Sequence, residues 1–324
     1  MLQQMNWQVK VLVAVAMVAA VQTSAQAEEQ TTTAAESATT AESVMPKGQV
    51  EKKEGESDVD EVITNRKLRA ETGAKSKYSF SAALSYSGGT VNSPGADTRP
   101  NIATGTATPT VPAMGGSLGA KYKLSQLQSL SMDVGIVSRK PFHNDAKKSL
   151  RERTTVSNPS LTYQVVYKAG GVQNVSSVSG TIVTDDFYRE LGYQYGADFS
   201  QTAIYDFGGS NFSMGLAFTA GMNTFDKNDA ALQAMQGDYS FGFYPFAEYV
   251  FSDRLNLRTV FRPFTFEHIR SEPFGNVIRN VYTQSVGVGV SVTRDIYLYP
   301  NVQFVPEDFR SELTNVGLSA NINI

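Results

Sequence analysis

The sequence predicts an all-β protein, a transmembrane antiparallel up-and-down β-barrel of about twelve strands behind a disordered segment with one short helix. Three observations predict it. Apolar and polar residues alternate over many runs of roughly 9–13 residues, the length that a tilted strand needs to cross a bilayer. The links between these runs are alternately long and short. After residue 27, no apolar stretch reaches the ~18 residues that a helical span requires.

The N-terminus has the pattern of an export signal. Lys10 precedes the apolar run 11–21, and the small residues Ala25 and Ala27 predict cleavage before Glu28. This apolar run is too short for a transmembrane helix, which needs about 20 residues. We therefore expect residues 1–27 to be a signal peptide, with an uncleaved membrane anchor as the alternative.

Residues 28–77 are expected to precede the folded domain. Residues 28–56 are rich in Thr, Ala, Glu, Ser and Lys and contain no aromatic residue, a composition that predicts disorder. A short helix is expected near 58–72, capped by Ser57 and stopped by Gly73. Its apolar stripe is narrow, and Leu68 is expected to point elsewhere. The stripe consists of Val59, Val62, Ile63 and Ala70. This favours a solvated or loosely docked helix over a plug or a partner-binding element.

Residues 78–324 carry the alternation. The chain has 18 Phe, 15 Tyr and 1 Trp, and Trp7 is the only one of these before Tyr78. Period two begins at Tyr78 and recurs up to the last run, 316–324. A soluble β-sandwich is the alternative, but its strands are usually about five or six residues long. Tyr and Phe at the ends of many runs favour a membrane barrel, where they form two interfacial girdles.

The links between the runs give the strand number. The long links are 88–113, 140–157, 184–189, 225–237, 267–276 and 305–311. The short links are 125–129, 169–171, 208–209, 252–254 and 293–295, and Gly208-Gly209 predicts a two-residue hairpin. The run near 172–183 lacks clean alternation in either phase. Ten or fourteen strands therefore stay open beside twelve.

The signal peptide, the alternation, the loop asymmetry and a last strand that ends the chain resemble Gram-negative outer-membrane β-barrels of the porin-like class. The resemblance covers the last three-quarters of the chain and departs from the class at Ile324, where an aromatic residue is typical. It implies an outer-membrane location with both termini and residues 28–77 in the periplasm. It also implies contact with outer-membrane lipid and the barrel assembly machinery, and it leaves homo-oligomers open.

Strand parity predicts which side chains face the lumen. The expected lumen-facing charges are Lys121, Lys123, Asp133, Arg139, Glu190, Asp198, Glu248, Arg258, Arg262 and Arg279, and Tyr297 and Tyr299 are expected to face inward with them. These charges predict an ion-selecting eyelet, weakly favouring anions. The alternative is a salt-bridged interior that fills a narrow barrel.

The turns predict cross-strand partners. The 252–254 turn places Glu248 opposite Arg258 and Tyr244 opposite Arg262. The 125–129 turn places Asp133 opposite Lys121 or, after a slip of two, opposite Lys123. The 293–295 turn places Gly289 opposite Tyr299 and Ser291 opposite Tyr297.

Composition and motifs argue against catalysis. The chain has 0 Cys and a net charge of −3, which excludes disulfides and leaves no basic surface for nucleic acid. His143 and His268 have no nucleophile at a productive spacing, and no cofactor or metal motif is present. We therefore expect a non-enzymatic pore for small polar solutes or ions. A structural or surface-adhesion barrel with a blocked lumen is the alternative, since loop 88–113 could contact partners or fold inward.

Overall fold

The computed structural model describes residues 50, 57–143 and 154–324. The predicted signal peptide and most of the predicted disordered segment lie outside these residues. Within the described part of the chain, no helix is both long and apolar enough to cross a membrane.

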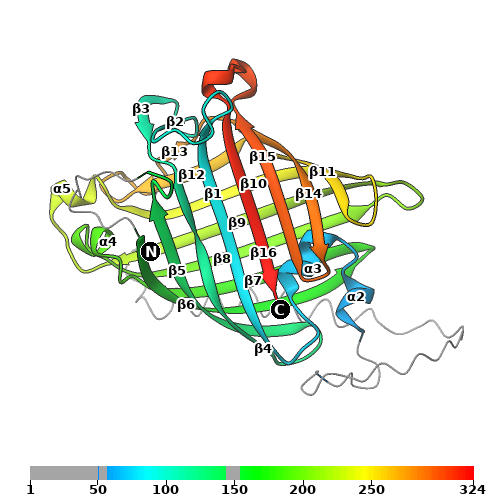
Figure 1. Ribbon diagram of the computed structural model, residues 1–324. Coiled ribbons are helices and arrows are strands. Elements are labelled where there is room, and N and C mark those ends of the chain that lie inside the picture. The colour runs from blue at the N-terminus through cyan, green and yellow to red at the C-terminus, as the bar shows by residue number, and fades with distance from the viewer. Residues whose placement is uncertain (1–49, 51–56, 144–153) are drawn as a thin grey trace, which may run out of the picture. The chain divides into compact units, whose positions relative to one another are not determined.

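The described residues form one antiparallel sheet that closes into a barrel (Figure 1). Around the barrel the strands are β1 (Tyr78–Thr90), β4 (Ala113–Lys123), β5 (Gln128–Arg139), β6 (Thr154–Ala169), β7 (Val172–Ile182), β8 (Tyr193–Asp206), β9 (Phe212–Phe225), β10 (Gly237–Val250), β11 (Leu255–Arg262) continued by β12 (Phe264–Ile269), β14 (Thr283–Thr293), β15 (Ile296–Phe304) and β16 (Asn315–Asn323). β1 pairs with both β4 and β16, and β10 pairs with β11, which closes the ring. Counted over the described residues, the barrel has the predicted 12 strands.

Short elements decorate the connections. A separate hairpin of β2 (Arg99–Asn101) and β3 (Thr106–Thr110) lies in the first long link, and β13 (Val277–Arg279) pairs with β12. The other long links hold α4 (Asp186–Glu190), α5 (Ala230–Gln233) and the 3-10 turns η1 (Pro306–Asp308) and η2 (Ser311–Leu313). Over the described residues, the long links lie at one end of the barrel and the short turns at the other, as predicted.

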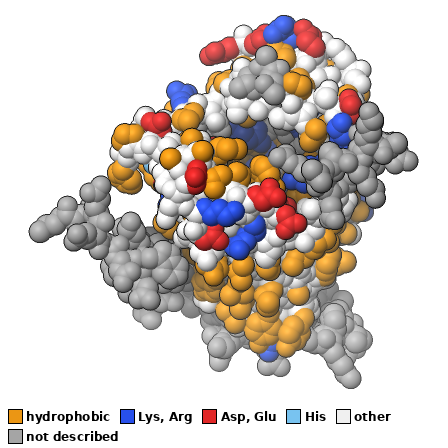
Figure 2. Space-filling model, turned by 90° about the vertical axis from the view of Figure 1, so that its left-hand side faces the viewer, with side chains coloured by type: hydrophobic (Ala, Val, Ile, Leu, Met, Phe, Trp, Pro, Cys, Tyr) orange, Lys and Arg blue, Asp and Glu red, His pale blue; other side chains and the backbone are white. Residues whose placement is uncertain are grey.

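The outer wall is apolar. Met132 is 70% exposed, Val156 66% and Leu161 49%, although each lies within a strand. Figure 2 shows hydrophobic side chains gathered over the wall, with charged side chains gathered above them in that view. A soluble protein rarely exposes apolar patches of this extent. The hydrophobic effect therefore requires that this wall be covered by lipid, which rules out the soluble β-sandwich.

Aromatic pairs mark both ends of the wall. At the turn end, the ring centroids of Tyr78 and Tyr122 are 5.2 Å apart, and those of Tyr249 and Phe251 are also 5.2 Å apart. At the loop end, Tyr86 lies 5.4 Å from Phe142. Aromatic rings favour the membrane–water interface because they join an apolar body to a polar edge. These pairs form the two predicted girdles.

The doubtful strand near 172–183 forms as β7, and its contacts explain the missing alternation. Its outward side chains Asn174 and Ser176 bond to Gln201 of the neighbouring strand, so part of its lipid-facing side is polar. Its inward Val175 is only 6% exposed and lies in an apolar cluster inside the barrel. Polarity is therefore partly inverted along this strand, and no period-two rule could detect it.

Two predicted turn details are wrong. The 208–209 link is a four-residue hairpin closed by Phe207 and Phe212, and only Gly209 has positive φ, at 78°. The β4–β5 turn is tighter than expected, because the backbone N–H of Leu124 donates to the Gln128 carbonyl. Lys121 therefore pairs with Ser131, and Asp133 pairs with Gly119. The shift is two residues, so the predicted faces hold although the predicted partners do not.

The other registers are confirmed in part. Glu248 lies opposite Arg258 and Ser291 lies opposite Tyr297, as predicted. The Tyr244–Arg262 pair does not form. Pairing with β10 stops at Val260 and resumes at Phe264 one residue out of step. Pro263 lies at this break because it has no backbone N–H to continue the ladder.

The predicted single helix is two short helices, α2 (Val59–Val62) and α3 (Arg66–Thr72). Asp58 caps α2 in a capping box with Glu61, so the predicted Ser57 cap is wrong. Asn65 caps α3, and Gly73 ends it with φ of 95°, as predicted. The break between the helices turns Leu68 onto the side of Val59, Val62 and Ile63. All four are buried, which a solvated helix would not allow.

Candidate functional site

The N-terminal helices are docked inside the turn end of the barrel. In Figure 1, α2 and α3 lie where β16 ends. Val59, Val62, Ile63 and Leu68 form one buried cluster with barrel side chains. The barrel side of this cluster is Val166, Val175, Ile204 and Phe246. All four barrel residues occupy inward positions, which are otherwise mostly polar. We call residues 58–75 the plug segment.

The plug segment reaches the opposite wall as well. Ala70 packs with Tyr297 and Tyr299 of β15. Lys121 of β4 donates from Nζ to the Glu71 carbonyl at 2.8 Å, and Asn323 of β16 lies 3.4 Å from the same oxygen. Contacts therefore come from strands around the whole circumference, so the plug segment spans the lumen. The prediction of a loosely docked helix is wrong. Burial of each large apolar side chain contributes about 2 kcal/mol to the docking free energy.

A hydrogen-bond cluster inside the lumen holds the linker between α2 and α3, and we call it the lumen cluster (Asn65, Gln173, Glu248). Gln173 Oε1 accepts from the backbone N–H of Thr64 at 2.8 Å and of Asn65 at 2.9 Å. Asn65 Nδ2 donates to Glu248 Oε2 at 2.9 Å. Glu248 also forms an ion pair with Arg258, and both side chains are at most 6% exposed. The buried carboxylate is thereby fully paired.

Ion pairs at the barrel rim fix the other end of the plug segment, and we call them the rim cluster (Asp58, Asp60, Lys75, Arg294, Asp295). Arg294, in the β14–β15 turn, lies 2.8 Å from Asp60 and also bonds Asp295. It donates to the Gly73 carbonyl at 2.9 Å. Lys75 Nζ lies 3.0 Å from Asp58 and 3.1 Å from Asp60.

These partners shift the pKa values of the rim cluster. Burial alone would raise the pKa of Asp60, but the hydrogen bonds and charges of Arg294 and Lys75 outweigh it, so the pKa falls below its ordinary 3.8. Burial opposes the shift of Asp58 too, but the Asp60 N–H and Lys75 lower its pKa. For Lys75, Asp58 and Asp60 outweigh burial and raise the pKa above 10.5.

The rim cluster predicts acid release of the plug segment. A lowered carboxyl pKa contributes docking free energy that is complete above 3.8 and is lost as pH falls through the lowered value. Protonated Lys75 contributes docking free energy that is complete below pH 10.5 and is lost as pH rises through its raised pKa. Protection of residues 58–75 from limited proteolysis should therefore be steady between these limits and fall below pH 3.8. An Asp58→Asn/Asp60→Asn variant should lose most of this acid response, and an unchanged response would assign it elsewhere.

The structure separates the predicted lumen residues into three groups. Lys121, Lys123, Glu248, Arg258, Tyr297 and Tyr299 lie beside the plug segment. Lys123 is 2% exposed, and its Nζ has no hydrogen-bond partner among the described residues. Asp133, Asp198, Arg139 and Arg262 occupy inward positions nearer the loop end. Of these, Asp133 accepts from Ser81 at 3.0 Å and Arg262 donates to Ser285 at 3.2 Å.

Two predicted lumen charges lie elsewhere. Arg279, in β13, pairs with Phe266 of β12 on the outer face of the barrel. Its guanidinium lies 5.5 Å from the Phe264 ring. The phase changes between β13 and β14, across residues 280–282, next to the break at Pro263 in the paired strand. Glu190 belongs to α4 in a long loop. Of the predicted lumen charges, five cations and three anions therefore occupy inward positions: Lys121, Lys123, Arg139, Arg258 and Arg262 against Asp133, Asp198 and Glu248.

The register of β14 and β15 sets Gly289 opposite Tyr299, as predicted, but the ring that lies over the glycine belongs to Tyr297. A Cβ on Gly289 would lie 2.0 Å from the hydroxyl oxygen of Tyr297, not against Tyr299. Tyr297 Oη donates to Asn256 at 3.2 Å, and Tyr299 Oη donates to the Arg258 carbonyl at 3.0 Å. The absence of a side chain at Gly289 thus leaves room for Tyr297, which reaches from β15 over β14 to Asn256 of β11 beneath α3.

Sequence reasoning missed the barrel side of the plug contact. Val166, Val175, Ile204, Phe246 and Val260 occupy inward positions and contact the plug segment or its cluster. In a lumen filled only by water, apolar inward residues would be unfavourable. A cluster of them near the turn ends of several strands was therefore a usable signal that something apolar fills that end.

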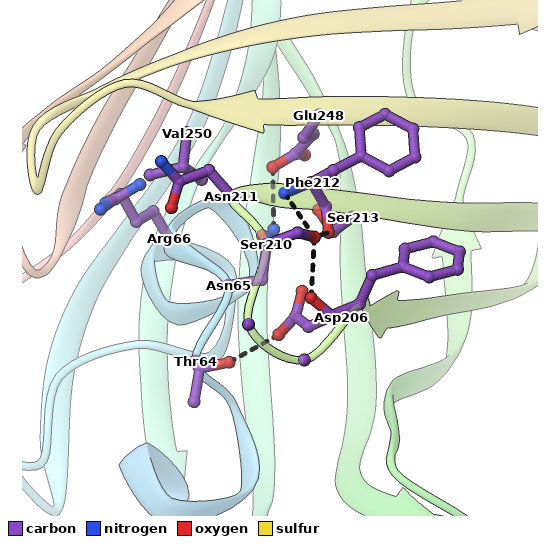
Figure 3. A pocket seen from close by; sticks show the side chains of 13 residues that line it. Thr64, Asn65, Arg66, Asp206, Ser210, Asn211, Phe212, Ser213, Glu248 and Val250 are labelled. Carbon is purple, nitrogen blue, oxygen red and sulfur yellow. Dashed lines mark hydrogen bonds between the residues drawn. The ribbon is translucent and has the colours of Figure 1, made fainter.

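A cavity of about 340 Å³ lies between the plug segment and the β8–β9 hairpin (Figure 3). Thr64, Asn65 and Arg66 line one side, and Asp206 and Glu248 line the other. Thr64 Oγ1 donates to Asp206 Oδ2 at 3.0 Å across it. This seam brings solvent next to the bonds that hold the linker.

The first long loop covers part of the opposite mouth. Arg99 of β2 lies 3.5 Å from the inward Gln303, and Asn315 donates to the Pro100 carbonyl at 3.1 Å. The Val281 N–H donates to the Ala103 carbonyl at 2.8 Å. Of the two arrangements left open for loop 88–113, the structure shows the inward one.

Both histidines bond to loop groups at the loop end. His268 Nδ1 lies 2.6 Å from Asp238 Oδ1 and Nε2 lies 3.1 Å from the Pro273 carbonyl. Its ring stacks on Tyr239 with centroids 4.5 Å apart. His143 Nε2 lies 2.6 Å from the Gly95 carbonyl. These contacts anchor loops to the girdle.

No protein-family model matches the chain, and no curated protein sequence matches it. Solved structures with a similar fold include an outer membrane channel from Pseudomonas putida F1 (14% identity, 78% of this chain and 97% of that chain, TM-score 0.47). OmpF of Salmonella typhi in complex with daunomycin (8%, 78% and 98%, TM-score 0.37) and the NanC porin (8%, 76% and 98%, TM-score 0.43) are also similar. These similarities concern the fold alone.

The strand pairing and the exterior settle the class. A closed antiparallel ring, an apolar outer wall and two aromatic girdles define a transmembrane β-barrel of the outer-membrane type. Such barrels place their short turns in the periplasm. The end that holds α2 and α3 is therefore the periplasmic end.

Proposed function

We propose that the barrel is an outer-membrane pore for small polar solutes or ions. The observation that carries the proposal is the lining of the lumen between the plug segment and the loops. Inward positions of β7, β9 and β16 there are small and polar: Ser177, Ser179, Thr219, Gly221, Gly317 and Ser319. Small polar side chains leave room for water, whereas a filled barrel interior would carry bulky ones.

The charges support passage of hydrated solutes. Asp198 and Arg262 lie on strands β8 and β11, at inward positions about eight residues from the periplasmic turns. Charged groups that face a wet lumen bias which ions pass. Strand register also turns Lys168, Asp206 and Glu267 inward, so inward cations and anions are close to balanced and the preference for anions is small.

The alternative is a structural or surface-adhesion barrel whose lumen stays blocked. The plug segment and the inward first loop are the observations that favour it. The two functions differ in one respect, which is whether a conducting path exists once the plug segment is gone.

A variant lacking residues 28–77 tests the pore. In planar bilayers it should give discrete channels with a small preference for anions, because removal of the plug segment opens the periplasmic end of the lumen. Arg262→Glu in this background should shift the reversal potential toward that of a cation-selective channel. Such a shift would show that the current crosses the lumen. An intact, folded barrel without discrete channels would support the blocked-barrel alternative.

A further inference from the structure

We propose that residues 58–75 are a releasable gate that leaves the lumen as one unit toward the periplasm while the barrel stays closed. The inference rests on the proposed pore function and adds its regulation. In the docked state the gate blocks the path, and in the released state the apolar inward residues face water and the path is open.

The barrel wall is complete without the gate. The twelve wall strands close through their own ladder, and the plug segment contributes no strand to it. The polar contacts that hold α2 and α3 come from barrel side chains such as Gln173, Lys121 and Arg294. Release therefore breaks no rung of the sheet, and the cooperative unit that unfolds is only the gate.

The polar side chains that hold the gate also have partners on the barrel. When Asn65 leaves, Glu248 keeps its ion pair with Arg258 and a hydrogen bond from Asn256 at 3.0 Å. Gln173 keeps Asp206, since its amide nitrogen already donates to that carboxylate. Arg294 keeps Asp295. Breaking a buried pair is costly mainly because it strands a charge, and here no charge is stranded. Release thus breaks the Asp60–Arg294 ion pair and exposes the apolar cluster.

The chain path permits release without threading. The plug segment connects directly to β1 at its periplasmic start, where the Lys123 N–H donates to the Lys77 carbonyl at 2.9 Å. Upstream, the Val50 carbonyl accepts from Gln126 in the β4–β5 turn, also at the periplasmic end. Both ends of the gate therefore lie on one side of the membrane. The gate can swing outward about residues 73–77.

The hinge needs a glycine in the docked state. Gly73 has φ of 95°, and a Cβ there would lie 2.6 Å from the Asn323 side chain. The cavity shown in Figure 3 supplies water to the seam, so replacement hydrogen bonds are at hand when Thr64 and Asn65 leave. The seam lies at the start of α3 and the hinge at its end, so α3 connects the two.

A reversible cross-link across the seam tests the gate. Thr64→Cys with Asp206→Cys places two thiols where the side chains now meet at 3.0 Å, and the chain has 0 other cysteines. A short bis-methanethiosulfonate reagent joins them and dithiothreitol releases them. Linked full-length protein should conduct at least tenfold less than the same sample after reduction, with linkage measured by peptide mass. Each single-cysteine variant is the matched control and should show no change on treatment.

The possible results separate the gate from the pore. Equal current in the linked and reduced protein overturns the gate, provided that the variant lacking residues 28–77 conducts in the same bilayers. If that truncated variant is silent, the pore function itself fails. Current that depends on the link supports both.

Discussion

Leu68→Asp should convert the closed barrel into a conducting one. Leu68 has 0% exposure and belongs to the apolar cluster between the plug segment and the barrel. Its replacement loses about 2–3 kcal/mol of apolar burial and adds the desolvation of a carboxylate, roughly 2 kcal/mol or more. A change of about 4 kcal/mol shifts the docked-to-released ratio roughly a thousandfold.

The measurement is macroscopic current at equal amounts of inserted protein. Leu68→Met is the matched control, because it keeps volume and apolarity and should leave the current at the wild-type level. Limited proteolysis supplies a second readout, since a released plug segment exposes its backbone between residues 58 and 75. Unchanged current in Leu68→Asp together with cleavage of the segment would show that the plug segment does not block the path.

Glu248→Leu should lower the unfolding free energy of the barrel by about 3–5 kcal/mol, because it leaves the Arg258 guanidinium buried without a counter-charge. Arg258 has 5% exposure and lies 4.1 Å from the Phe246 ring, so it has little access to solvent. Two consequences follow from the same residue. The barrel loses stability, and the plug segment loses the acceptor for Asn65.

Urea unfolding in lipid vesicles, followed by the electrophoretic shift between folded and unfolded barrel, measures the first effect. The matched control exchanges the two charges, Glu248→Arg with Arg258→Glu, which restores an ion pair between opposed positions and should recover more than half of the loss. If the exchanged pair is as unstable as Glu248→Leu, the pair acts through its specific geometry and not through charge compensation.

The sequence predicted the wall of this protein well because a local rule decides which way each wall side chain faces. Tyr78, Met132 and Leu257 face outward since lipid covers one side of the strand and the side-chain period is two. The same rule placed Glu248 opposite Arg258 through one turn. It failed where the strands change phase, at Pro263 and, in the paired strand, between β13 and β14, where Arg279 turns to the outer face.

The lumen contents could not be predicted in the same way. Val175 and Ile204 contradict a polar interior, and their partners Val59 and Leu68 are more than one hundred residues away in the chain. The narrow stripe on residues 58–72 became a buried surface only because the break at residues 63–65 rotates α3 against α2. No periodicity in either segment records that rotation.

The sequence by itself determined the barrel and the face of nearly every wall residue and favoured twelve strands, because lipid outside and water inside impose a pattern on each strand independently. Only the tertiary structure decided that the periplasmic end is occupied and by what. The physical reason is that docking depends on the match between two apolar surfaces from distant parts of the chain, with Asn65, Gln173 and Glu248 paired between them. Taken alone, each apolar surface contradicts the pattern of its own segment, and only the contact between the two surfaces explains both.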